Sequence, residues 1–63
     1  MFNQYPDVLT VPQVAEALRI GRAAAYKLVN KKVIGSVRIG KTIRVPKSNL
    51  IAYVESSRYN VSL

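Results

Sequence analysis

The hydrophobic period of this chain changes partway along its length, and that change limits the folds open to it. Apolar residues recur at helical spacing as far as about residue 30. Between Val37 and Val45, apolar and charged residues alternate instead, which is typical of β-strands. Since 63 residues can enclose only one thin core, both parts must share it. The sequence therefore predicts one small α+β domain that is mainly α-helical.

A first helix is predicted to begin after Thr10 and to end near Leu18 or Arg19. Thr10 is a favourable capping residue, and Gln13 stands three positions further on, as in a capping box. Pro12 fits the first turn, where its missing N–H costs no hydrogen bond. Gly21 then interrupts the helical spacing, so a short turn should follow.

A second helix is predicted from about Arg22 to Asn30 or Lys31. Ala25, Leu28 and Val29 fall on one side of it and can pack against the first helix. The opposite arc is polar and aromatic and consists of Arg22, Ala23, Tyr26, Lys27 and Asn30. Two short helices joined by a tight glycine-containing turn are typical of a helix-turn-helix, whose second helix enters the DNA major groove. A plain helical hairpin with a solvated face is the alternative interpretation.

The alternating segment predicts a two-stranded β-hairpin, and its register depends on the loop. A three-residue loop, Gly40–Thr42, pairs Ile39 with Ile43 and keeps the apolar side chains on one face. A two-residue loop would instead place Arg38 opposite Ile43 and mix charge into that face. We therefore expect the three-residue loop, with Arg38 directly opposite Arg44.

That register predicts a hairpin in which like charges meet. Facing arginines would cost a few tenths of a kcal/mol, and Lys41 at the tip adds a third cation. Stability alone would not favour this arrangement, whereas a wing that grips phosphates would. The hairpin is therefore predicted to be the wing of a winged helix-turn-helix.

The net charge of +7 is unevenly distributed. No acidic residue occurs between Ala17 and Val54, yet nine of the 10 basic residues lie there. These nine are Arg19, Arg22, Lys27, Lys31, Lys32, Arg38, Lys41, Arg44 and Lys47. Such unneutralised charge repels itself, and a polyanion such as nucleic acid would relieve the repulsion. From charge alone, a solvated basic surface is the alternative.

Gly35–Thr42 matches the phosphate-binding P-loop pattern G-x-x-x-x-G-K-T at every fixed position. A P-loop requires a helix directly after it, so that the helix N-terminus faces the phosphates. Here an alternating strand and then Pro46 follow, and the next acidic residue is Glu55. The match is therefore interpreted as coincidental, and nucleotide binding is not expected.

The residue types also argue against catalysis and against metal binding. The chain has no cysteine and no histidine, so the usual nucleophile–histidine pairs and zinc sites cannot form. The three carboxylates lie toward the ends and offer no acid–base pair. We predict that the protein is not an enzyme and uses no cofactor and no metal.

A last helix is predicted to begin near Pro46 or Lys47, and its periodic part ends at Glu55. The predicted organisation is an N-terminal arm over residues 1–8, the winged helix-turn-helix domain over 9–55, and a flexible C-terminal tail over 56–63. No apolar run approaches the roughly 20 residues that span a bilayer, and the N-terminus lacks a signal-peptide pattern. We expect a cytoplasmic, nucleoid-associated protein with no membrane association.

Four segments together resemble a known family. They are residues 9–18, 20–29, 37–41 and 43–50. In these segments the chain resembles the excisionase-type DNA-binding proteins, relatives of the MerR-type winged helix. The resemblance implies a recombination directionality factor, which bends DNA beside an attachment site and directs an integrase toward excision. A small phage- or plasmid-type transcriptional regulator with the same fold is the alternative, because fold alone does not choose between them.

The chain departs from this family in its recognition helix. The family usually has Ser at the position of Gly21, and Ser-Thr before a β-branched residue where Ala23–Ala25 stand. Glycine can still cap a helix at a small loss. The alanines remove side-chain hydrogen bonds, so base readout is expected to be sparse, although Ala23 can touch a thymine methyl.

The predicted DNA-binding residues come from the second helix and the wing. They are Arg22, Ala23, Tyr26, Lys27, Asn30, Arg38, Lys41 and Arg44. The expected partner is double-stranded DNA, together with an integrase, and the protein is expected to be a monomer that binds DNA cooperatively. An RNA-binding module is a further alternative, disfavoured because the hairpin offers no aromatic stacking platform.

Overall fold

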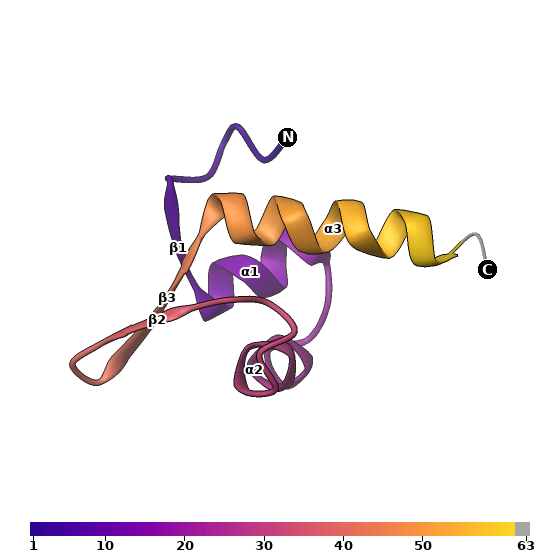
Figure 1. Ribbon diagram of the computed structural model, residues 1–63. Helices are drawn as coiled ribbons and strands as arrows, with labels where there is room; N and C mark the ends of the chain where they lie inside the picture. Colours follow the sequence, from indigo (N-terminus) through magenta and orange to yellow (C-terminus); the bar gives the residue numbers. More distant parts are fainter. Residues whose placement is uncertain (62–63) are drawn as a thin grey trace.

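The computed structural model describes the backbone of residues 1–61 and the side chains of residues 1–56. Two short helices, a β-hairpin and a long last helix follow one another, preceded by a short strand (Figure 1). The elements are β1 (Val8–Thr10), α1 (Val11–Leu18), α2 (Arg22–Asn30), β2 (Val37–Ile39), β3 (Thr42–Pro46) and α3 (Lys47–Val61). This is the predicted winged helix-turn-helix, in which α1 and α2 form the helix-turn-helix and β2–β3 form the wing.

The start of α1 confirms the predicted capping box. The Thr10 Oγ1 accepts a hydrogen bond from the Gln13 N–H at 3.2 Å, and the Gln13 Oε1 accepts one from the Thr10 N–H at 2.9 Å. The helix ends after Leu18, as expected. It is Arg19, not Gly21, that takes the left-handed conformation there, with φ of 56°.

Helix α2 follows its predicted course and buries the predicted side. Ala25 and Val29 are buried against the core, and Leu28 packs beside them. Gly21 caps the helix with extended backbone and no side-chain hydrogen bond. Beyond the C-terminal end of the helix, Lys32 adopts the left-handed conformation, with φ of 60°.

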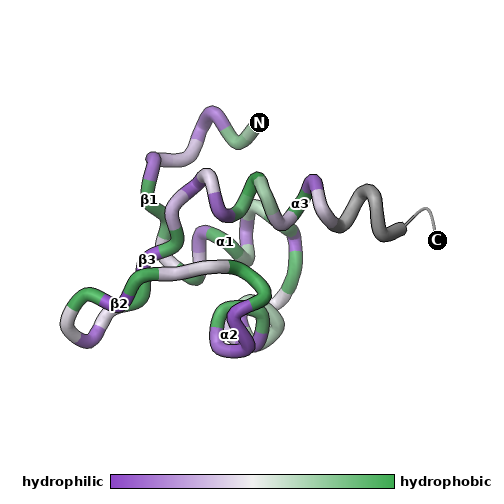
Figure 2. The backbone as a smooth tube through the Cα atoms, in the orientation of Figure 1, coloured by the Kyte–Doolittle hydropathy of each residue, from purple (hydrophilic) through white to green (hydrophobic). Residues whose placement is uncertain are grey.

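The core is small and draws on every part of the fold except β2. Along α1 and α2, hydrophobic and hydrophilic residues are interspersed (Figure 2), and the buried residues of each helix recur at helical spacing. The buried hydrophobic residues are Leu9, Val11, Val14, Ala15, Ala25, Val29, Ile34, Val45 and Leu50.

A third strand, absent from the sequence prediction, joins the hairpin to the rest of the domain. Part of the segment expected to be an arm forms β1, which pairs antiparallel with β3, so that the sheet order is β1-β3-β2. Leu9 of β1 lies opposite Val45 of β3, and both are fully buried. The wing is therefore anchored at its base by a buried strand pair.

The predicted hairpin register is wrong. Val37 pairs with Arg44, Arg38 with Ile43 and Ile39 with Thr42, which leaves a two-residue loop. The expected loop rested on a buried apolar face, but all three residues of β2 are exposed, and Ile39 is 61% exposed. Without burial to set the register, the turn sets it: Gly40 supplies the positive φ of 62° that a tight hairpin turn requires.

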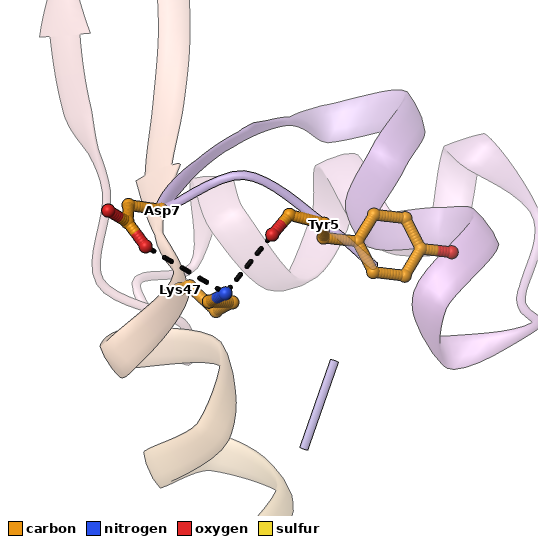
Figure 3. Close-up of polar contacts among 3 residues, drawn as sticks. All are labelled: Tyr5, Asp7 and Lys47. Carbon is orange, nitrogen blue, oxygen red and sulfur yellow. Dashed lines mark hydrogen bonds and ion pairs between the residues drawn. The ribbon is translucent and has the colours of Figure 1, made fainter. Parts of the chain in front are cut away.

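Helix α3 is longer than the sequence pattern indicated, because it continues beyond Glu55 to Val61. Its first residue, Lys47, is tied to the N-terminal segment (Figure 3). The Lys47 N–H donates to the Asp7 carbonyl at 2.7 Å, and its Nζ donates to the Tyr5 carbonyl at 3.0 Å. The same Nζ lies 3.8 Å from the Asp7 Oδ1. These contacts extend the β1–β3 pairing to the start of α3.

The register of the wing can be tested at Gly40. Because a Cβ is disfavoured at positive φ, Gly40→Ala should lower the free energy of unfolding by about 1 kcal/mol, or the Tm by roughly 4–8 °C. Gly40→Asn should lose less, since asparagine tolerates this conformation. Equal Tm values for both variants and the original protein, measured by circular dichroism, would contradict the two-residue turn.

Candidate nucleic-acid interface

The eight residues predicted to bind DNA lie on the surface, in two groups. The five from α2 are all exposed, including Tyr26 at 42% of its surface. In the wing, Arg38 and Lys41 are exposed and Arg44 is half-buried. Helix α2 and the wing lie on the side of the molecule opposite α3 (Figure 1). Both groups can therefore meet one partner without involving α3.

The observed register separates the two wing arginines. Directly paired residues of antiparallel strands point to the same face of a sheet. Arg38 thus shares the face of Ile43, which packs against the core, whereas Arg44 shares the opposite face with Val37. The two arginines do not face each other, so the expected repulsion does not exist and gives no support for a phosphate-gripping wing. The wing still carries three cations, now divided between its two faces and its tip.

Two hollows flank the wing. The first has a volume of about 400 Å³ and is lined by Val29, Asn30, Lys32, Gly35, Ser36, Arg38 and Ile43. The second has a volume of about 190 Å³ and is lined by Thr10, Val11, Pro12, Tyr26, Lys41, Thr42, Ile43 and Arg44. The fold thereby brings Asn30 close to Arg38, and Tyr26 close to Lys41 and Arg44.

The remaining predicted residues are placed differently. Ala23 and Lys27 border an apolar hollow of about 520 Å³ between the helices, which Tyr53 of α3 also lines. Arg22 lines none of these three hollows and stands exposed in the first turn of α2. Its position matches the N-terminal end of a recognition helix, from which base contacts are usually made.

Sequence reasoning did not single out Lys32 and Ser36, which line the first hollow together with Arg38. In the sequence, Lys32 is only one of nine basic residues between Ala17 and Val54, where no acidic residue occurs. Its position beside Arg38 depends on the chain reversal after α2 and on the hairpin register, neither of which the sequence pattern fixed.

Two of the three acidic residues contact partners outside α2 and the wing. Glu16 accepts a hydrogen bond from the Tyr5 hydroxyl at 2.8 Å, and this bond to a carboxylate raises the pKa of Tyr5 above its usual value. Asp7 lies beside Lys47, so the positive charge of this lysine is paired within the fold. Among the described side chains, no carboxylate lines either of the two hollows beside the wing.

The P-loop match is coincidental, because the segment forms a β-hairpin and not a strand, loop and helix. Thr42 begins strand β3 where a P-loop would begin a helix. Gly40 forms the tight turn, and the Gly35 carbonyl accepts a hydrogen bond from the Asn49 Nδ2 at 3.0 Å. A Cβ at position 35 would lie 2.9 Å from that nitrogen, so close packing against α3 explains this glycine.

Comparison with known proteins agrees with this geometry. The family described as "Helix-turn-helix domain" matches residues 8–58. An excisionase of Streptomyces ambofaciens is 32% identical over 50 residues, which cover 79% of this chain and 81% of that protein. The chain belongs to the excisionase-type helix-turn-helix family. Its fold is therefore that of an excisionase-like DNA-binding domain.

A second relative from this family is a probable excisionase of Saccharopolyspora erythraea. It is 41% identical over 46 residues, which cover 73% of this chain but only 47% of that protein. The chain thus spans about half the length of this relative. No solved structure matches the chain.

Two further observations concern the described residues. No group of three His, Cys, Asp or Glu side chains among them is placed to hold a metal ion. None of the helices within residues 1–61 has both the length and the apolar character needed to cross a bilayer.

Proposed function

We propose that this excisionase-like domain binds a specific duplex DNA sequence and assists an integrase in excising a mobile element. The proposal rests on the surface that α2 and the wing form together. Exposed cations lie on this surface, and no carboxylate lines the two hollows beside the wing. A DNA phosphate backbone is the partner that such a surface favours, because each neutralised phosphate releases a counterion.

Helix α2 enters the major groove with its N-terminal end first. Arg22 reads a guanine, since a guanidinium can pair bidentately with O6 and N7. Ala23 contacts a thymine methyl, and Lys27 reaches a phosphate. Tyr26 faces the hollow shared with the wing and therefore contacts the backbone at the junction between α2 and the wing. Sequence preference is thus concentrated at Arg22.

The wing follows the DNA backbone or the adjoining minor groove. Arg38 lies on the sheet face of Ile43 and Arg44 on the opposite face, with Lys41 in the turn between them. Because the cations point in different directions, the wing can meet phosphates on both sides of one groove. Such contacts position the domain but carry no sequence information.

The excisionase role is favoured by the two relatives that carry this name, one of which matches over most of its own length. A single winged domain makes a small contact with DNA. We therefore propose that the protein is a monomer that binds several neighbouring sites cooperatively, at a nucleoid-associated location in the cytoplasm.

Backbone contacts predict a strong dependence of affinity on salt. If about five phosphates are neutralised, log K against log salt should fall with a slope of −4 to −5. Fluorescence anisotropy with a labelled duplex, between 50 and 300 mM KCl (about the range in which such slopes are linear), measures it. A slope near zero would contradict the proposed interface.

The division of roles between α2 and the wing can be tested with two variants. Arg22→Ala should weaken binding to the preferred site by about 1–3 kcal/mol and change binding to random duplex little, because it removes a base contact. Lys41→Ala should weaken both duplexes equally and reduce the salt slope by about 1. Both affinities follow from competition binding. If each variant loses as much affinity for the preferred site as for the random duplex, the proposed division of roles between α2 and the wing is refuted.

The biological role is tested by recombination between attachment sites in the presence of the integrase encoded by the same element. We expect addition of the protein to increase excision and not integration. An unchanged excision yield, together with repression of a neighbouring promoter, would instead assign the protein as a transcriptional regulator.

A further inference from the structure

The hollow between the C-terminal end of α2 and the wing has the chemistry of an anion site. Its lining includes the cations of Lys32 and Arg38, the amide of Asn30 and the hydroxyl of Ser36. All four residues are exposed, so an outside ligand can reach them. No acidic residue lines the hollow, so its two positive charges are not neutralised from within.

Arg38 belongs to this hollow only because of the observed register. Its pairing with Ile43 turns it to the face of the sheet on which the core lies. The wing projects beyond the core there, so Arg38 stays exposed and meets the end of α2 instead of being buried. With the alternative three-residue loop, Arg38 would lie on the other face, beside Arg44.

Lys32 adds an independent indication, since its backbone is unfavourable for its residue type. Its φ is 60°, in a position after a helix that glycine or asparagine usually occupies. A lysine there costs stability relative to glycine. Unfavourable backbone at a residue that lines a charged hollow is typical of positions kept for binding.

We propose that this hollow binds one phosphate of the DNA backbone, with Lys32 and Arg38 as its cations and Asn30 and Ser36 as hydrogen-bond donors. The inference rests on the proposed binding of duplex DNA and adds Lys32 and Ser36 to the interface. Residues from α2, from the following loop and from β2 hold the same phosphate. This single contact therefore fixes the wing relative to the helix in the major groove.

The decisive variant is Lys32→Gly, and the chain offers a matched control. Arg19 is also a cation with a left-handed backbone after a helix, at φ of 56°, but it does not line the hollow. Lys32→Gly and Arg19→Gly each remove one charge and relieve the same backbone conformation. Both should raise the Tm by a few degrees, because glycine is favoured at positive φ.

Only Lys32→Gly should then lose affinity for duplex DNA. We expect roughly a three- to tenfold loss at 0.1 M salt and a salt slope reduced by about 1, as for one lost phosphate contact. Arg19→Gly should change the affinity and the salt slope by less than half as much as Lys32→Gly does. A stabilised variant that binds DNA more weakly cannot be explained by a structural role of Lys32.

Coupling to the wing gives a second measurement. If Lys32 and Arg38 hold the same phosphate, the double variant Lys32→Gly/Arg38→Ala should lose less affinity than the two single losses combined. Additive losses would overturn the shared site. A lower Tm for Lys32→Gly would also count against the proposal, because it would contradict the backbone cost from which it starts.

Separate arms distinguish DNA from a free anion. If the original protein binds no duplex at all, the proposed function fails; if it binds but Lys32→Gly matches Arg19→Gly, only this inference fails. Titration with inorganic phosphate at constant ionic strength, followed by the Ser36 amide signal in NMR, completes the test. Saturation by inorganic phosphate together with equal duplex affinities of the two glycine variants would assign the hollow to a free anion.

Discussion

The buried pairing of β1 with β3 supports every other part of this small domain. Leu9 and Val45 face each other with no exposed surface, and they join the N-terminal segment, the wing and the helices in one core. An isolated two-stranded hairpin is only marginally stable in water. Strand β2 buries none of its residues, so it depends entirely on β3 for its position. The wing can extend into solvent because β1 holds its base.

Because β1 anchors the base of the wing, the cations of the wing can remain accessible to a partner. Strand β2 and the tip of the wing lie outside the core, so Arg38 and Lys41 are exposed and Arg44 is partly exposed. Asp7 pairs with Lys47, and Glu16 accepts a hydrogen bond from Tyr5, so neither acid neutralises these cations. Lys47 is the exception among the central cations, because it binds Tyr5 and Asp7 and so serves the fold. The two hollows beside the wing then collect charge from α2 and from the hairpin. We therefore expect affinity for a polyanion to come from the outward-facing side chains of α2 and from the outer part of the wing.

The elements that depend on local interactions were predictable. The capping box of Thr10 and Gln13, the turn near Gly21 and the buried side of α2 all involve residues within a few positions of one another. The register of the wing was not predictable from the same pattern. Alternation indicates which face is buried only where a face is buried, and at β2 none is. The pairing of β1 involves residues far apart in the sequence, so no local pattern revealed it.

The sequence by itself determined a basic winged helix-turn-helix, the exposed face of α2 and the exclusion of histidine- or cysteine-based chemistry. These follow from hydrophobic period, capping and residue types, which act locally or do not depend on conformation. Only the tertiary structure decided where each charge points. Arg38 joins Lys32 in one hollow, and Arg44 joins Tyr26 and Lys41 in the other. The physical reason is the side-chain period of two in a β-strand, since a shift of one residue in register moves a side chain to the opposite face.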